Sequence, residues 1–198
     1  TIYESAPNKL YSIAEISGVG KIESGCDGQV RWEVTSMTGP RVLEGDEKAI
    51  ADRLGAFDAT LHWKRYYQSA KTTAIEDVDG KLHYRVTLTP QAGPPVTAFY
   101  DRKTFLQSKV SLTMKGPMGE VPLEIMFDES REVDGILLPH RQVTRVPGIE
   151  NIVSLKSIKH NVSIPADKFA LPEAIQALVE LSAQQNKTTA PAQPPKKP

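Results

Sequence analysis

The stretch "DVDGKLHYRVTL", residues 77–88, limits the possible folds most strongly, because apolar and polar side chains alternate without exception after a turn. This period of two is typical of a β-strand with two different faces. One face carries the apolar residues Leu82, Tyr84, Val86 and Leu88. The other face carries Lys81, His83, Arg85 and Thr87, which we expect to face water. The apolar face must contact either an ordinary protein core or the wall of a cavity.

Tight turns repeat along the chain and divide it into short strands. Asp-Gly pairs at 27–28, 79–80 and 134–135 supply the positive φ angles of hairpin turns. Alternating runs recur in "QVRWEV", "SKVSLTM" and "VPLEIMF". The pattern predicts about eight to ten antiparallel strands in one large sheet, which is wide enough that it must bend. We therefore expect a mainly β fold (α+β) built on a strongly curved, unclosed antiparallel sheet, a half-barrel.

Helical patterns are confined to three places. In "GDEKAIADRLGAF" the residues Ile50, Leu54 and Phe57 recur every three or four positions. "DATLHWKRYY" predicts a second short helix with Leu61, Trp63 and Tyr66 turned partly inward, and a third helix begins at Pro172. We expect these two or three short helices to cover the concave face of the sheet. Residues 1–183 are predicted to form a single domain, and the proline-rich residues 184–198 a disordered tail.

Composition excludes several classes of function. Lysine plus arginine and aspartate plus glutamate both total 24, so the net charge is zero and nucleic acid is not an expected partner. No apolar run approaches the roughly 20 residues of a membrane-spanning helix. The histidines have no metal-ligand spacing, so we expect no metal and no cofactor, and surface or strand-edge positions for His62, His83, His140 and His160.

The order of these elements resembles the LolA/LolB-like family of periplasmic lipoprotein-sorting proteins, in its divergent outer-membrane lipoprotein-sorting-like branch. The stretches that carry the resemblance are "GCDGQVRW" (25–32), "EDVDGKLHYRVTL" (76–88), "AFYDRKTFLQSKV" (98–110), "REVDGILLPHR" (131–141) and "NVSIPADKFALP" (161–172). The resemblance implies an open curved sheet with helices over its open side, around a hydrophobic cavity that accepts acyl chains. It also implies a periplasmic location, with an export signal removed from this sequence or lying outside it.

On this basis we expect a monomeric, non-enzymatic periplasmic carrier whose partners are lipid or lipoprotein acyl chains, with envelope proteins as further partners. The predicted contact residues, which share apolar side chains on the sheet and the first helix, are Trp32, Tyr84, Val86, Leu88, Leu112, Leu123, Ile125, Phe127, Ile50, Leu54 and Phe57. Two alternatives stay open. The chain could be an interaction or scaffold domain with a filled core, or a hydrolase or accessory domain of an envelope peptidase.

Overall fold

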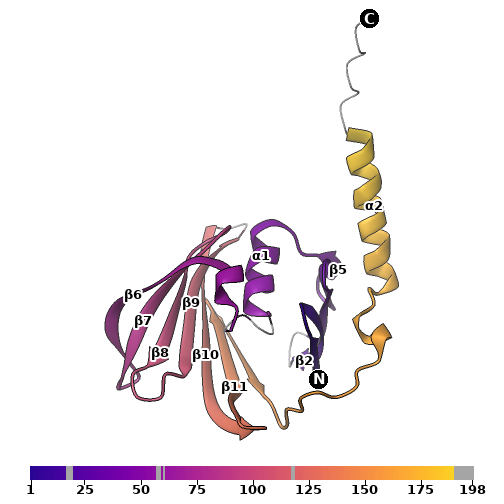
Figure 1. Cartoon of the computed structure of the whole chain (residues 1–198). Helices are drawn as coiled ribbons and strands as arrows, with labels where there is room; N and C mark the ends of the chain where they lie inside the picture. The colour runs from indigo at the N-terminus through magenta and orange to yellow at the C-terminus, as the bar shows by residue number, and fades with distance from the viewer. Residues whose placement is uncertain (17–19, 57–58, 60, 117–118, 190–198) are drawn as a thin grey trace, which may run out of the picture. The chain divides into compact units, whose positions relative to one another are not determined.

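The computed structural model describes residues 1–16, 20–56, 59, 61–116 and 119–189. The described chain is mainly β and divides into two compact units. One unit joins the two ends of the sequence, Thr1–Asp58 and Ile164–Pro198, and the other is the central segment Ala59–Ser163. Figure 1 shows the elements of both units along the chain.

The first unit contains a five-stranded antiparallel sheet in sequence order. Its strands are β1 (Ile2–Ser5), β2 (Lys9–Ile16), β3 (Gly20–Asp27), β4 (Arg31–Thr35) and β5 (Gly39–Val42). Its helices are α1 (Gly45–Leu54), the short 3₁₀ helix η2 (Ala166–Phe169) and α2 (Glu173–Thr189). The returning segment packs on this sheet, with η2 against β2 and β3 and α2 against β5.

The second unit contains a seven-stranded antiparallel sheet in the order β12-β11-β10-β9-β8-β7-β6. A single 3₁₀ turn, η1 (Trp63–Arg65), precedes it. Its strands are β6 (Tyr67–Val78), β7 (Lys81–Pro90), β8 (Val96–Asp101), β9 (Gln107–Gly116), β10 (Gly119–Val133), β11 (Ile136–Val146) and β12 (Ile149–Ser154). The edge strands β6 and β12 do not pair with each other, so this sheet is unclosed, and Figure 1 shows that it is strongly curved, as its width led us to expect.

The number of sheets differs from the prediction. The described residues form twelve strands in two sheets, where we expected eight to ten strands in one. The reason is the long connection between Val42 and Tyr67, which contains α1 and η1. A meander continues from strand to strand only through short turns, so this connection ends one sheet and starts another.

Two of the three Asp-Gly turns have the predicted hairpin geometry. Asp79 and Gly80 have φ angles of 52° and 77°, and Asp134 and Gly135 have 50° and 80°. Positive φ at both central residues matches the right-handed twist of the flanking strands. At the third pair only Gly28 has a positive φ, and the Asp27 carboxylate instead accepts hydrogen bonds from the backbone N–H groups of Gln29 and Val30. The connection between β3 and β4 is therefore a side-chain-capped loop.

The helices agree with the sequence in part. Helix α1 forms as predicted, but the second predicted helix is only the 3₁₀ turn η1. Trp63 and Tyr66 are half-buried, whereas Leu61 is 84% exposed rather than turned inward. Helix α2 begins after Pro172 and buries Ile175, yet it continues through residues 184–189, which we expected in the tail. The rest of that tail lies outside the described residues. Neither α1 nor α2, among the described residues, has the length and apolar character needed to cross a membrane.

An aromatic row crosses the five-stranded sheet. Strand pairing aligns Tyr3, Tyr11, Gly25 and Trp32 on neighbouring strands. Ring centroids are 6.3 Å apart both for Tyr3 and Tyr11 and for Tyr11 and Trp32. A Cβ atom at Gly25 would lie 2.7 Å from Trp32 Cζ2 and 2.9 Å from the Leu10 carbonyl oxygen. Only glycine therefore leaves room for the indole ring to lie across β3.

A buried ion pair links α1 to β4. The Arg31 side chain is only 8% exposed, and its Nε lies 2.8 Å from Asp52 Oδ1 on α1. Lys48, one helical turn earlier, lies 2.5 Å from the other carboxylate oxygen of Asp52. Arg31 Nη2 is buried and has no hydrogen-bond partner among the described residues. Asp52 therefore provides the counter-charge of an arginine that water cannot reach.

We predict that Gly25→Ala lowers the free energy of unfolding by about 2 kcal/mol, because the added methyl group overpacks the space under Trp32. Urea denaturation of both proteins measures this. In a Trp32→Ala background, Gly25→Ala should lower the free energy of unfolding by less. Some loss should remain, because the new methyl group still lies too close to the Leu10 carbonyl oxygen. Equal losses in both backgrounds would show that the indole ring does not require glycine.

Removal of the buried counter-charge should be costly as well. We expect Asp52→Ala to destabilise the protein by about 3 kcal/mol, since it leaves the Arg31 guanidinium buried and uncompensated. Glu47→Ala on the same helix is the matched control. Glu47 pairs with Arg41 at the surface, where an ion pair contributes less than about 1 kcal/mol. Similar losses for the two variants in thermal unfolding would contradict a special role of Asp52.

Candidate functional site

One face of the seven-stranded sheet, called here the apolar face, carries most of the predicted contact residues. Strand register and alternation place seven of them on this face: Tyr84, Val86, Leu88, Leu112, Leu123, Ile125 and Phe127. Leu112 is 4% exposed, and Leu123 and Ile125 are also buried, whereas Val86 and Leu88 are half-buried. Three separate stretches of sequence thus converge on one continuous surface.

The centre of the apolar face consists of residues that sequence reasoning left out of the site. One row across the strands contains Val86, Ala98, Val110 and Ile125 in register, and the next contains Leu88, Val96, Leu112 and Leu123. Val96, Ala98 and Val110 are all buried. The available signal was the alternation of Val96, Ala98 and Tyr100 in "VTAFYD". That run is only six residues long and follows a proline-rich loop, so it gave a weaker pattern than β7 or β10.

Tyr84, at the periphery of this face, already has protein partners. Its ring stacks on Phe105, with centroids 6.3 Å apart and planes at 14°, and the Arg102 guanidinium lies 5.6 Å from its centroid. Phe105 is 68% exposed and has a φ of 59°, an unusual conformation for a bulky residue. The loop therefore holds Phe105 in place against Tyr84.

The electrostatics of the loop between β8 and β9 centre on Asp101. Its carboxylate accepts hydrogen bonds from the backbone N–H groups of Thr104 and Lys103, and these bonds lower the pKa of Asp101. Burial, by contrast, raises the pKa of the neighbouring Tyr100 phenol. An ionised side chain at the last residue of β8 thus holds the start of the loop in place.

The remaining predicted contact residues belong to the other unit. Trp32 and Ile50 are buried there, while Leu54 is exposed at the end of α1. Phe57 lies outside the described residues. A common surface that includes these residues and the apolar face therefore stays a prediction.

The opposite face of the same sheet, called here the polar face, is less exposed to water than we predicted. His83 is only 2% exposed, and its Nδ1 lies 2.9 Å from the Lys81 carbonyl oxygen. It lies in register between Glu76 on β6 and Asp101 on β8. His140 on β11 is buried too, although the pairing of Gln142 with Phe127 places it on the side of the apolar face, so the prediction of surface or edge positions is wrong for both histidines. The burial of a single residue depends on tertiary packing, which the alternation within one strand cannot reveal.

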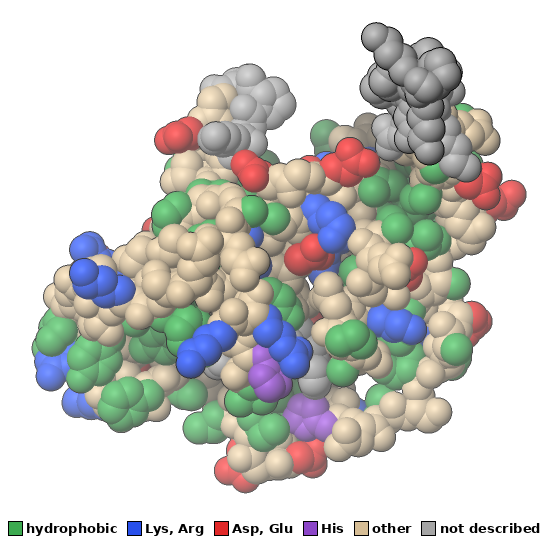
Figure 2. All heavy atoms as spheres, turned by 45° about the horizontal axis from the view of Figure 1, so that its top comes forward, with side chains coloured by type: hydrophobic (Ala, Val, Ile, Leu, Met, Phe, Trp, Pro, Cys, Tyr) green, Lys and Arg blue, Asp and Glu red, His purple; other side chains and the backbone are tan. Residues whose placement is uncertain are grey.

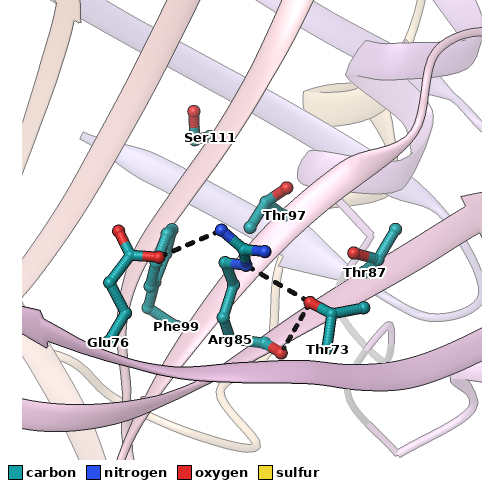
Figure 3. Close-up of a pocket in the computed structure, with 7 residues that line it drawn as sticks. All are labelled: Thr73, Glu76, Arg85, Thr87, Thr97, Phe99 and Ser111. Carbon is teal, nitrogen blue, oxygen red and sulfur yellow. Dashed lines mark hydrogen bonds and ion pairs between the residues drawn. The ribbon is translucent and has the colours of Figure 1, made fainter.

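A pocket of about 330 Å³ opens on the polar face. Its lining comes from four adjacent strands and consists of Thr73, Glu76, Arg85, Thr87, Thr97, Phe99 and Ser111. Figure 3 shows the Arg85 side chain between Glu76 and Thr73, and it donates a hydrogen bond to each of them. Two residues that we expected to face water, Arg85 and Thr87, are half-buried because they line this pocket. None of the predicted contact residues belongs to it.

Charges are mixed on the molecular surface. Lysine and arginine side chains alternate with acidic, hydrophobic and uncharged ones on the face drawn in Figure 2, in agreement with the balanced composition. Within the described part of the chain, no group of three or more His, Cys, Asp or Glu side chains is placed to hold a metal ion. The chemistry that the described surfaces offer is therefore apolar contact on one face of the sheet and hydrogen bonding on the other.

Comparison with known proteins identifies fold relatives. No family model matches the sequence, and no curated protein matches it. A crystal structure of a DUF1329 family protein from Desulfovibrio piger matches with a TM-score of 0.53 and 16% identity, over 85% of this chain and 78% of that chain. The structure of a putative outer membrane lipoprotein-sorting protein domain from Vibrio parahaemolyticus matches with a TM-score of 0.51 and 12% identity, over 81% and 80%.

A LolA superfamily protein from Nitrosomonas europaea matches at a TM-score of 0.46 and 14% identity, covering 84% of this chain and 86% of that one. Identities this low bear on the fold alone. Together with the open antiparallel sheet, the two structures above a TM-score of 0.5 confirm the fold that the sequence resemblance implied. The chain therefore shares its fold with the Desulfovibrio piger protein and the Vibrio parahaemolyticus domain.

Proposed function

We propose that the protein is a non-enzymatic carrier of the bacterial periplasm that holds lipid or lipoprotein acyl chains against the apolar face of its seven-stranded sheet. The observation that carries the proposal is the pair of in-register apolar rows across β7, β8, β9 and β10. An acyl chain binds by burial of its methylene groups, so it needs a continuous apolar surface rather than catalytic side chains.

The fold relatives support this proposal. One of them is described as an outer-membrane lipoprotein-sorting domain, and it shares the fold over most of both chains. A sorting protein has to shield acyl chains from water during transfer, and an unclosed sheet provides an apolar surface that an extended chain can enter from one side. A periplasmic location follows from the same proposal, because lipoproteins travel through that compartment.

A second candidate function is a scaffold or interaction domain whose apolar face is filled core. The burial of Leu112, Leu123 and Ile125 favours it, because side chains so little exposed are already in contact with protein atoms. Each such residue stabilises the fold by about 1.5–3 kcal/mol when it packs fully. In the carrier, packed side chains would have to move apart before an acyl chain could enter.

Chain length distinguishes the two candidates. For the carrier we expect affinity for saturated fatty acids to rise about fourfold per added methylene, because each buried methylene contributes about 0.8 kcal/mol. Displacement of a fluorescent fatty acid by lauric, myristic and palmitic acids measures this, and native mass spectrometry of the purified protein would detect lipid that copurifies. If no chain length binds, the scaffold candidate replaces the carrier.

Leu112→Lys tests the same face by substitution. The lysine places a charge in the centre of the apolar rows, so the carrier should lose acyl-chain binding at least tenfold while the circular dichroism spectrum stays native. Thr113→Lys is the matched control, because the neighbouring residue is exposed on the polar face. Global unfolding of Leu112→Lys alone would identify this face as filled core.

A further inference from the structure

The pocket on the polar face contains a row of hydroxyl groups that acyl-chain binding does not use. Thr87, Thr97 and Ser111 lie in register on β7, β8 and β9 and all line the pocket. Neighbouring strands are about 4.8 Å apart, so the three side chains form a regular row. Among the described residues, none of these hydroxyls makes a hydrogen bond to another protein group. Each is free to donate one hydrogen bond and to accept others.

A β-bulge builds the side of the pocket next to this row. The register between β6 and β7 shifts between Thr72 and Ala74, so Thr73 is the additional residue of the bulge. Its hydroxyl donates to the Arg85 carbonyl oxygen at 3.3 Å and accepts from Arg85 Nε at 3.2 Å. Bulges re-aim side chains and are frequent beside binding sites. Figure 3 shows both hydrogen bonds between Thr73 and Arg85, which hold the arginine side chain against the edge strand β6.

The charge of the lining is balanced. Arg85 Nη1 lies 3.2 Å from Glu76 Oε2, so the lining contains one cation and one carboxylate paired with each other. An anionic ligand would have to compete with Glu76 for the guanidinium. An apolar ligand would leave three hydroxyls without partners, which costs about 1–3 kcal/mol for each buried group. A neutral ligand rich in hydroxyl groups would neither compete with Glu76 for the guanidinium nor leave the three hydroxyls without hydrogen-bond partners.

We propose that this pocket binds a neutral saccharide. Sugar hydroxyls both donate and accept hydrogen bonds, and so they complement the row of Thr87, Thr97 and Ser111 as well as the Arg85–Glu76 pair. Phe99 provides an apolar wall, with Lys109 held 5.5 Å from its ring centroid. Apolar walls with a few placed polar groups are the usual lining of small-molecule sites. The proposal is independent of acyl-chain binding, which concerns the opposite face.

Titration of the ¹⁵N-labelled protein with maltotriose, cellotriose and chitotriose tests the proposal by amide chemical shifts. We expect at least one sugar to shift amides of β7, β8 and β9 near the hydroxyl row. Thr97→Val removes the central hydroxyl and keeps the side-chain shape, so it should weaken binding at least fivefold. Thr113→Val lies on the same face of β9 outside the pocket and should bind like the unchanged protein.

The spectrum of each variant shows directly whether it is folded. The proposal is overturned if none of the three sugars shifts the polar-face amides. It is also overturned if inorganic phosphate or acetate shifts these amides and the sugars do not, which would identify an anion site. Equal sugar affinities of Thr97→Val and Thr113→Val would place the contact away from the row. Fatty-acid binding, measured separately, tests the carrier function and does not affect these outcomes.

Discussion

Cross-strand register in the seven-stranded sheet is the constraint on which the rest of this structure depends. Because side chains alternate with a period of two, the register decides which residues form the apolar rows and which line the polar pocket. A slip of one residue in β8 would exchange Ala98 with Phe99, and thus mix the two faces. The two hairpin turns with positive φ at both central residues help to fix that register at the ends of β7 and β11.

The other unit is built from both ends of the sequence, which pack against each other. Its sheet carries the aromatic row, and Lys168 from the returning segment lies 5.6 Å from the Tyr3 ring and 5.5 Å from the Tyr11 ring. Phe169 and Ile175 are buried in the same segment. Each cation–π contact contributes only about 0.5–1 kcal/mol at an exposed site, so the burial of the two apolar side chains supplies most of the attachment.

The two faces of the large sheet make different demands on a ligand. The apolar rows would bind methylene groups of any sufficiently long chain. A row of hydroxyls would instead bind ligands whose donors and acceptors match its own. A carrier of lipoproteins and a scaffold with a filled core differ mainly in whether the apolar face can open. That difference is energetic rather than topological, because both share the same strand order and the same buried side chains.

The sequence alone determined the period of two, most of the turns, helix α1 and the seven residues that share the apolar face, because these follow from local pattern and backbone chemistry. It could not determine the division into two sheets, which depends on where a long connection prevents pairing. Nor could it place Ala98 and Val96 at the centre of the face, because cross-strand register decides that, or show that His83 is buried, because tertiary packing decides burial. Tertiary structure alone created the pocket, since Thr73, Arg85 and Ser111 meet only through register and a bulge.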